Sequence, residues 1–272
     1  MVIPAFAGAL DDSQPRPLAL ITGASSGIGL DLARVMASDF DLIITARNQA
    51  RLEEIARELQ SGHASRVHLI PADLARPEAP QQIFGEVDRR GLQVDVLVNN
   101  AGFGAYGAFA DSSLTSQLEM IQVNITALTH LTRLALPGMI QRKRGRIMNV
   151  ASTAGFQPGP LMAVYYATKA YVISFSEAIA NELQGSRVTV TCLCPGATAT
   201  EFAVRADMDK SRLFKMGKMS SMAVARAGYR AMMKGKTLTI PGFRNLMLAE
   251  SVRLSPRKMV TAIARKIQER VE

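Results

Sequence analysis

The sequence of 272 residues predicts an α/β fold, in which one doubly wound parallel sheet is covered by helices on both faces. Apolar runs of strand length alternate with amphipathic stretches of helix length along most of the chain. The strand-length runs are apolar at nearly every position, which is typical of parallel strands buried on both faces. Right-handed crossovers between such strands place ligands at the carboxyl ends of the strands.

Seven strands are expected, because seven short apolar runs recur in order. They cover residues 18–22, 41–45, 67–70, 94–99, 145–150, 188–193 and 238–240. Helices are expected between the strands, where apolar residues recur three or four positions apart. These amphipathic stretches cover residues 28–38, 49–60, 77–89, 114–136 and 163–183.

The chain shows neither a linker nor a solenoid-type repeat, so residues 1–272 are expected to form a single domain. The pattern breaks at about residues 200–236, which are rich in methionine and in basic residues. Flexible methionines suit an adaptable pocket wall or lid, so this is the expected substrate-binding segment. Ordinary packing between two helices is the alternative for any single methionine. The residues concerned are Met208, Met216, Met219, Met222, Met232, Met233, Arg205, Lys210, Arg212, Lys215 and Lys218.

Composition argues against several classes of protein. Cys192 and Cys194 alternate on a predicted strand and are expected to pack as small apolar residues. A metal site would need more ligands, and the 3 histidines show no ligand spacing. No apolar run reaches the ~18 residues of a membrane helix. The apolar residues 1–10 lack a basic flank and run into Asp11 and Asp12, unlike a secretory signal, so a cytoplasmic location is expected.

The net charge of +9 is distributed unevenly between the two halves of the chain. Residues 1–136 hold 10 basic and 15 acidic side chains, a balance of −5, whereas residues 137–272 hold 22 and 8, a balance of +14. This favours an anionic partner for the second half: cofactor phosphates, a charged substrate or a membrane surface. A scattered basic surface that serves solubility is the alternative. No nucleic-acid-binding pattern is present, so nucleic acid is not an expected partner.

A glycine-rich turn follows the first predicted strand and opens the first predicted helix. Gly23, Gly27 and Gly29 would let the backbone turn tightly and approach a pyrophosphate, and the helix N-terminus would supply free N–H groups. The spacing is not G-x-G-x-x-G, so an ordinary tight turn is the alternative for the loop taken alone. In this context the loop predicts a dinucleotide site of Rossmann type.

Arg47 stands 20 residues beyond Gly27, at the end of the second predicted strand. An acidic residue there would bind the ribose hydroxyls of NAD, whereas an arginine suits the extra phosphate of NADP. Asp41 lies at the wrong end of that strand. The expected cofactor is therefore NADP(H). The alternative is a surface arginine paired with a neighbour such as Glu54.

Tyr165 and Lys169 are four residues apart and so lie on one face of a predicted helix. There an ammonium group would lower the pKa of the phenol, which is ordinarily about 10. Such a phenol can protonate a carbonyl oxygen while a hydride arrives, or accept the proton of an alcohol in the reverse direction. Tyr166 is three residues before Lys169, so the spacing alone leaves both tyrosines open.

With these motifs in order, the chain resembles the short-chain dehydrogenase/reductase family, in its NADP(H)-preferring type, over about residues 16–245. The matching motifs are TGASSGIG (22–29), Asp73-Leu74, NNAG (99–102), Asn124, Ser152, YYATK (165–169), Pro195-Gly196, Thr198 and Thr200.

The resemblance implies a role for each matching residue. Tyr165 would be the general acid/base, and Ser152 would hold the substrate oxygen near it. Lys169 would bind the nicotinamide ribose and lower the pKa of Tyr165, while Asn124 would support a water chain to Lys169. The family pattern selects Tyr165 over Tyr166. The implied cofactor-binding residues are Gly23, Ser25, Ser26, Gly27, Ile28, Gly29, Arg47, Asp73, Leu74, Asn100, Ala101, Gly102, Tyr165, Lys169, Pro195, Gly196, Thr198 and Thr200.

The sequence departs from many NADP-preferring relatives at Ala24-Ser25-Ser26, where those relatives carry a second basic residue. Arg47 would then bear most of the discrimination between the two cofactors. For Ser152 and Asn124, capping of the backbone is the alternative to a catalytic role. Asp73 and the Asn99–Gly102 turn follow predicted strands, where a doubly wound sheet presents groups to a dinucleotide, and the turn could equally be plain loop chemistry.

The expected activity is NADP(H)-dependent hydride transfer between nicotinamide and a carbonyl or secondary alcohol. A catalytically idle NADP-binding sensor, an interaction protein with a basic C-terminal half, and an epimerase or dehydratase are the alternatives. The Met-rich, basic segment suggests an apolar, acyl or lipid-like substrate. A steroid, sugar, quinone or small ketone fits the sequence as well.

Residues 256–272 are expected to form a basic amphipathic helix, because Met259, Ile263, Ile267 and Val271 recur every four positions. Three functions compete for this helix. It could be a subunit interface in a homo-oligomer, a dimer or tetramer, which the family resemblance supports. It could also lie on an anionic membrane surface. The third possibility is packing on its own domain.

Overall fold

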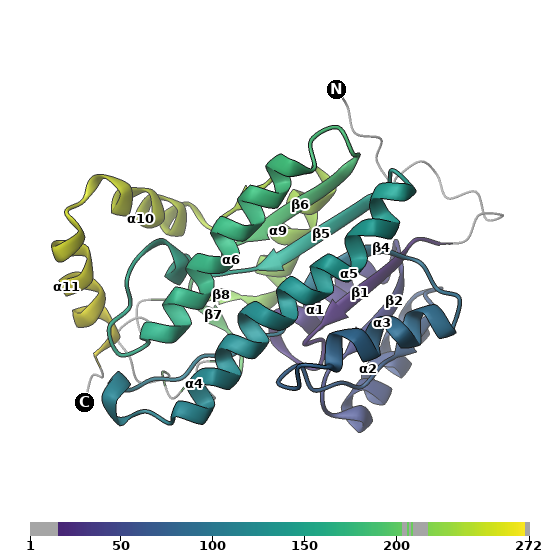
Figure 1. Cartoon of the computed structure of the whole chain (residues 1–272), viewed down its shortest axis with the longest axis horizontal. Coiled ribbons are helices and arrows are strands. Elements are labelled where there is room, and N and C mark those ends of the chain that lie inside the picture. The colour runs from purple at the N-terminus through teal and green to yellow at the C-terminus, as the bar shows by residue number, and fades with distance from the viewer. Residues whose placement is uncertain (1–15, 203–205, 207, 209–216, 270–272) are drawn as a thin grey trace.

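The structure is a computed structural model that describes residues 16–202, 206, 208 and 217–269 (Figure 1). Several residues singled out in the sequence lie outside the described residues: the apolar stretch 1–10, Asp11, Asp12, Arg205, Lys210, Arg212, Lys215, Met216 and Val271. In the described part of the chain, no helix is both long and apolar enough to span a bilayer.

A seven-stranded parallel sheet forms the centre of the molecule, with the order β3-β2-β1-β4-β5-β6-β9. This confirms the predicted fold class. Five strands have the predicted bounds, and the two edge strands are each one residue shorter than predicted. The strands are β1 (Leu18–Thr22), β2 (Asp41–Thr45), β3 (Val67–Leu69), β4 (Val94–Asn99), β5 (Gly145–Val150), β6 (Val188–Leu193) and β9 (Leu238–Thr239).

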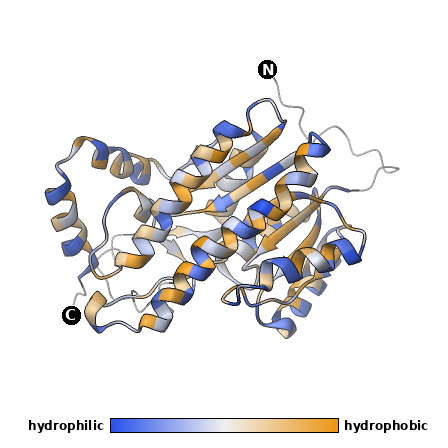
Figure 2. Ribbon diagram, in the orientation of Figure 1, coloured by the Kyte–Doolittle hydropathy of each residue, from blue (hydrophilic) through white to orange (hydrophobic). Residues whose placement is uncertain are grey.

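Helices cover both faces of the sheet (Figure 1). On one face lie α1 (Gly27–Met36), α2 (Gln49–Gly62) and α9 (Ser221–Met233), and on the other lie α3 (Ala79–Arg89), α5 (Leu128–Gln141) and α6 (Ala163–Glu182). Neighbouring strand residues enter opposite layers: Ile21 packs under the first set and Leu20 under the second. Figure 2 shows that the surrounding helices carry both hydrophobic and hydrophilic residues, as helices buried on one side do.

The strand order reverses between β1 and β4. The chain runs outward from β1 to β3, then returns to the centre and runs outward again from β4 to β9. The loops after β1 and β4 therefore leave the sheet in opposite directions and open a crevice between them. In doubly wound sheets this is the place where ligands bind.

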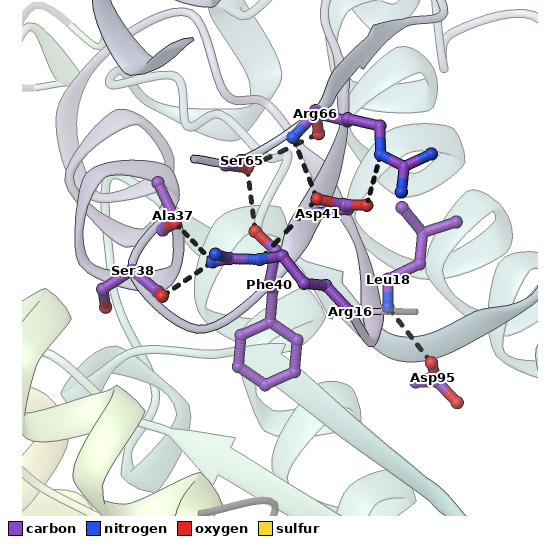
Figure 3. A network of polar contacts seen from close by, with 9 residues as sticks. All are labelled: Arg16, Leu18, Ala37, Ser38, Phe40, Asp41, Ser65, Arg66 and Asp95. Atoms are coloured by element: carbon purple, nitrogen blue, oxygen red, sulfur yellow. Dashed lines mark hydrogen bonds and ion pairs between the residues drawn. The ribbon is translucent and has the colours of Figure 1, made fainter. Parts of the chain in front are cut away.

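The amino ends of β1 and β2 are closed by a polar network (Figure 3). The carboxylate of Asp41 accepts a hydrogen bond from the backbone of Arg66 at 2.9 Å and forms ion pairs with Arg16 and Arg66 at 3.7 and 3.4 Å. The side chain of Asp95 accepts from the backbone N–H of Leu18 at 3.1 Å. These contacts hold Asp41 at the amino end of β2, whereas Arg47 follows the carboxyl end, as the sequence predicts.

One predicted helix, 114–136, is three segments in the structure. α4 (Leu114–Ile121) passes through a π-helical turn (Gln122–Ala127) into α5, which continues through Pro137 to Gln141. A π-helical turn adds a residue to the turn without changing the apolar pattern enough to be seen in the sequence. The prediction ended at the proline, which α5 accommodates within its last turns.

Two helices were not predicted, α9 and α10 (Phe243–Leu254). α9 lies inside the Met-rich segment and is capped at its N-terminus by Ser220, whose side chain accepts from the backbone N–H of Ala223 at 3.2 Å. Two short paired strands, β7 (Thr198–Ala199) and β8 (Met219–Ser220), bring the two ends of residues 200–218 together.

The final helix is α11 (Arg257–Gln268), shorter than the predicted 256–272. Together α10 and α11 form the C-terminal arm, residues 243–268, which lies to one side of the sheet (yellow in Figure 1). The arm buries a narrow set of mostly small residues: Ala249, Val260, Ala264 and Gln268.

Candidate active site

A cavity of about 730 Å³ opens at the carboxyl ends of the parallel strands, in the crevice where the strand order reverses. Most of the residues predicted for cofactor and catalysis line it. They are Gly23, Ser25, Ser26, Gly27, Ile28, Arg47, Asp73, Leu74, Asn100, Ala101, Gly102, Ser152, Tyr165, Lys169, Pro195, Gly196, Thr198 and Thr200. Gly29 and Asn124 do not line the cavity but lie behind its wall.

The glycine loop has the backbone that its sequence predicts. Gly23 and Gly27 adopt φ angles of +65° and +56°, which side chains with a Cβ rarely adopt. A Cβ on Gly29 would lie 2.3 Å from the carbonyl oxygen of Gly23, so only glycine lets α1 begin this close to the loop. The N-cap residue Ser26 makes no side-chain capping bond, so its hydroxyl leaves the first N–H groups of α1 open to a ligand.

The NNAG turn is tied to this loop through Thr22, the first residue of the TGASSGIG motif, to which the sequence analysis assigned no separate role. The Thr22 hydroxyl accepts from the backbone N–H groups of Asn100 and Ala101, both at 3.0 Å. The Asn100 side chain donates to the carbonyls of Thr22 and Gly23 at 2.9 and 3.2 Å. The Thr22–Gly23 and Asn100–Ala101 segments therefore form one rigid wall.

Arg47 is exposed at the rim of the cavity, directly after β2. The alternative in which it pairs with Glu54 is not found, because Glu54 forms an ion pair with Arg51 at 2.7 Å. No ion pair of Arg47 exists within the part of the chain that the structure describes. Asp73 also lies at the rim. One of its carboxylate oxygens accepts a hydrogen bond from the backbone N–H of Ala75 at 3.1 Å and so stabilises the loop after β3.

The Lys169 ammonium lies inside the cavity wall, 5.8 Å from the centre of the Tyr165 ring. It donates to the carbonyl oxygen of Val150 at 2.9 Å, at the end of β5. Burial lowers the pKa of Lys169 to about 8, with the nearby thiols of Cys192 and Cys194 acting in the opposite direction. Beside the ammonium group, Gly102 makes room for Asn124, since a Cβ there would lie 2.9 Å from the Asn124 side-chain oxygen.

The environment of Tyr165 corrects one expectation. Burial raises the pKa of Tyr165 to about 12, and the hydroxyl of Ser152 offsets part of that rise. The sequence predicts a pKa lowered by Lys169. Desolvation is stronger here, because the phenol packs among apolar groups, with the ring of Phe202 5.3 Å away. Tyr165 therefore holds its proton at neutral pH.

Backbone capping is realised at Ser152, whereas the Asn124 side chain binds the backbone of the loop after β4. The Ser152 hydroxyl accepts from the backbone N–H of Ala154 at 3.1 Å and donates to the carbonyl of Pro195 at 3.3 Å, while also lining the cavity. Asn124 accepts from the backbone N–H of Phe103 at 3.1 Å and donates to its carbonyl at 3.0 Å. It also donates to the Thr168 hydroxyl at 3.0 Å, so it holds the loop after β4 onto α6.

Tyr166 also lines the cavity, but its surroundings differ from those of Tyr165. Its ring lies flat against Gly159, where a Cβ would come within 2.2 Å of it, and burial raises its pKa. The ring that lies near the Lys169 ammonium is that of Tyr165. The assignment of Tyr165 as acid/base stays a prediction that this geometry favours.

The cavity also contains residues that the sequence analysis missed: Phe103, Met162 and Phe202 on its apolar side, and the polar Gln157. Met208, from the Met-rich segment, is buried against this wall. Met219, Met232 and Met233 instead pack in or against the core beneath α9. For these three methionines the structure supports ordinary packing rather than a place in the pocket wall. No motif marks the missed residues, which reach the cavity only through the folding of loops far apart in the sequence.

A parallel sheet with a dinucleotide-type crevice and a buried tyrosine–lysine pair defines a class of nicotinamide-using oxidoreductases. The family model described as short chain dehydrogenase matches residues 17–211, and the chain belongs to the short-chain dehydrogenase/reductase family. This confirms the resemblance found in the sequence.

One curated relative and two solved structures illustrate the likeness. The relative is a protein of Streptomyces violaceoruber assigned as ketoacyl reductase 1 of the granaticin polyketide synthase, 38% identical over 74% of this chain and 75% of its own. A short-chain dehydrogenase from Sphingobium yanoikuyae in complex with NADPH is 31% identical, with a TM-score of 0.78 over 88% of this chain and 94% of that one. One from Burkholderia phymatum in complex with NAD is 25% identical, with a TM-score of 0.80 over 95% and 98%.

Proposed function

We propose that this oxidoreductase is an NADP(H)-dependent carbonyl reductase in which Tyr165 is the general acid. The observation that carries the proposal is the convergence, in one cavity, of a neutral buried phenol, a buried ammonium group and a glycine-rich helix N-terminus. The bound cofactor would supply the hydride. The chain supplies the proton and the alignment.

The choice of NADP(H) rests on Arg47. Its guanidinium is exposed at the rim next to β2, where it is free to meet a phosphate on the adenosine ribose. The glycine loop fits the pyrophosphate, because its positive φ angles expose N–H groups at the start of α1. The relative bound to NADPH supports this choice, while the one bound to NAD shows that the fold accepts either cofactor.

The proton would come from the Tyr165 hydroxyl. Because its pKa is raised to about 12, the phenol is protonated across the physiological range and suited to donate to a carbonyl oxygen as hydride reaches the carbon. The product is an alcohol, and Tyr165 is left as a phenolate that Lys169 stabilises. Ser152, on the same wall, would orient the substrate oxygen.

The substrate we propose is an apolar or acyl carbonyl compound. Aromatic and aliphatic side chains line the space beyond the tyrosines, including Phe103, Met162, Phe202 and Met208, and residues 200–236 would form the substrate-binding segment of a single domain. The name of the granaticin relative is consistent with a ketoacyl substrate.

Two further features complete the proposal. The buried thiols of Cys192 and Cys194 are free although their sulfurs lie 3.7 Å apart, which suits a reducing cytoplasm. A homo-oligomer is also proposed, because Leu114, Leu118 and Ile121 are exposed along α4 and could be covered by a second copy.

The experiment that tests this proposal is cofactor consumption with a panel of 3-oxoacyl thioesters, bulky ketones, aldehydes and sugars. Each compound would be assayed with NADPH and with NADH at equal concentrations. We expect turnover with NADPH, fastest for the acyl or other apolar carbonyls. Tight NADPH binding without turnover on any compound would contradict the reductase and favour the idle cofactor-binding alternative.

A further inference from the structure

The C-terminal arm exposes far more apolar surface than the rest of the chain. Seven of the 12 large hydrophobic side chains exposed in the described residues belong to it, although it holds only residues 243–268. They are Phe243, Leu246, Met247, Leu248, Leu254, Met259 and Ile263. Leu254 is 92% exposed and Phe243 is 78% exposed. A patch of this kind marks an interaction surface.

Most of the apolar residues of α10 are exposed: three lie on one face of the helix, and Leu246 and Leu248 flank that face on either side. Phe243, Met247 and Leu254 are spaced by four and seven positions, so they project from the same face. Ala249, buried against the body of the protein, lies on the opposite face. On α11, Met259 and Ile263 flank the buried strip formed by Val260 and Ala264. Both helices thus present an apolar ridge to solvent.

Basic side chains lie on the same two helices as the exposed apolar residues. Residues 243–268 contain six basic side chains and one acidic side chain, a net charge of +5. Arg257, Lys258 and Arg265 line an open groove of about 480 Å³ between α11 and Pro160. Glu250, the one acidic residue, is held in an ion pair with Arg253 at 3.4 Å. The surface therefore offers hydrophobic side chains and a concentration of positive charge together.

We propose that the C-terminal arm is a docking surface for an anionic phospholipid bilayer. Apolar side chains that enter the boundary of the acyl chains, beside cations that meet headgroup phosphates, are the two components of interfacial binding. A second copy of this chain fits the arm less well. A symmetric contact through the arm would set a surface of charge +5 against another of charge +5, and like charges oppose association.

The arm is also joined to the active site. Asn245 of α10 packs on Gly196, where a Cβ would lie 2.5 Å from the Asn245 side-chain oxygen, and Gly196 lines the cavity. Pro160, across the groove from α11, lies between the cavity-lining residues Gln157 and Met162. Docking of the arm would bring the apolar side of the cavity close to the bilayer. Apolar carbonyl compounds dissolved in the membrane would then have a short path to Tyr165.

The test is sedimentation of the purified full chain with vesicles of phosphatidylcholine alone and of phosphatidylcholine with phosphatidylglycerol. We expect binding to the anionic vesicles that falls as salt is raised. Arg257→Gln/Lys258→Gln should lower the partition coefficient about 25-fold, because each cation near such a surface contributes about fivefold. Phe243→Ser/Met247→Ser should lower it at least tenfold. All of these positions are exposed, and circular dichroism would confirm that the variants fold.

Two matched controls make the result specific to the arm. Arg226→Gln/Arg230→Gln removes the same charge from exposed positions on α9, and Phe109→Ser/Ile140→Ser removes two exposed apolar side chains that lie outside the arm and outside α4. Both controls should bind vesicles as the wild type does. Absence of binding to anionic vesicles by the folded wild type would overturn the proposal. So would a dimer that Phe243→Ser/Met247→Ser dissociates in light scattering while vesicles are ignored, since the occupant would then be a second copy.

Discussion

Tyr165 and Lys169 illustrate how burial, rather than charge proximity, sets the protonation of this site. Each is almost fully enclosed, and the neutral form of each is favoured: the pKa of Tyr165 rises to about 12 and that of Lys169 falls to about 8. Sequence spacing identifies the pair but contains no information on desolvation. The rise in the pKa of Tyr165 could therefore not be predicted from the sequence.

The lowered pKa of Lys169 predicts a pH dependence of stability. The folded chain releases this proton near pH 8, whereas an unfolded lysine holds it to about 10.5. Between these values the unfolded state binds more protons, so the free energy of unfolding rises with pH. Tyr165 acts in the opposite direction only above pH 10, where the folded chain keeps the phenolic proton. The effect of Lys169 on the free energy of unfolding is therefore best measured between pH 8 and 10.

Between pH 8 and 10 we expect Lys169 to raise the free energy of unfolding by roughly 2 kcal/mol, because each unit of pKa shift corresponds to about 1.4 kcal/mol. Lys169→Met should remove this contribution, because the variant has no proton to release. The measurement is urea unfolding of both proteins at several pH values. A difference between wild type and variant that stays flat or falls from pH 8 to 10 would refute the account of Lys169.

Arg47 gives a second prediction at this scale. Because it is the exposed cation that follows β2 at the rim of the cavity, Arg47→Ala should weaken NADPH binding about tenfold or more and leave NADH binding nearly unchanged. Arg51→Ala is the matched control, since Arg51 is also exposed on the same segment but is paired with Glu54. Isothermal titration with both cofactors measures the effect. An equal loss of affinity for NADPH and NADH would show that Arg47 does not distinguish the two cofactors.

The residues that sequence reasoning found and those that it missed differ in kind. Glycines with positive φ, the tyrosine–lysine pair and Arg47 occupy fixed positions relative to strand ends, so their spacing could predict them. The Thr22 hydroxyl accepts from the backbone N–H of Ala101, and the backbone N–H of Phe103 donates to the Asn124 side chain. Such contacts depend on tertiary structure, and no local pattern predicts them.

At the scale of elements, a buried chain of polar side chains joins the centre of the sheet to two helices. Asn99 of β4 donates to Thr132 of α5 at 3.0 Å and to Asn149 of β5 at 2.9 Å. Asn149 in turn donates to Ser176 of α6 at 2.9 Å. Hydrogen bonds of this kind are expensive to break when buried, so the network fixes the register of α5 and α6 against the sheet. It thereby positions Tyr165 and Lys169, which α6 carries.

The start of α1 gives a prediction about an element. Gly29→Ala would place a Cβ 2.3 Å from the Gly23 carbonyl oxygen, so helix and loop would have to separate. We expect a loss of about 1–3 kcal/mol of unfolding free energy, and weaker binding of both nicotinamide cofactors. Thermal unfolding and cofactor titration would measure these effects.

Gly85→Ala is the matched control for this prediction, because Gly85 lies within α3 and an added Cβ there meets nothing within 4 Å. Alanine in an open helical position should be neutral or stabilising by up to about 1 kcal/mol. If Gly29→Ala were as stable as Gly85→Ala and bound cofactor normally, the close approach of α1 to the loop would not matter.

Strands and helices could be predicted with different success for physical reasons. Strands β1, β2, β4, β5 and β6 are buried on both faces, so they are continuous apolar runs with sharp ends. α10 was missed because its apolar residues are exposed and its periodicity is weak. The π-helical turn at Asn124 was missed because local spacing does not distinguish it from an α-helix.

At the scale of the whole molecule, strand order explains why residues far apart in the sequence meet. The reversal between β1 and β4 gathers the glycine loop, the NNAG turn and the segment after β6 around one cavity. The uneven charge of the chain is explained in part by the arm, where six of the basic residues of the second half lie. The sequence predicts this imbalance, but the arrangement of cations beside exposed apolar residues is visible only in the structure.

In the reaction that we propose, Tyr165, and not its neighbour Tyr166, donates the proton. The most direct measurement is the rate of NADPH oxidation under single-turnover conditions for wild type, Tyr165→Phe and Tyr166→Phe, with the best carbonyl of the panel. We predict a loss of about 10²–10⁴-fold for Tyr165→Phe, the contribution typical of a positioned general acid, and a rate within about fivefold of wild type for Tyr166→Phe. Undiminished turnover in Tyr165→Phe, or a collapse confined to Tyr166→Phe, would contradict the account.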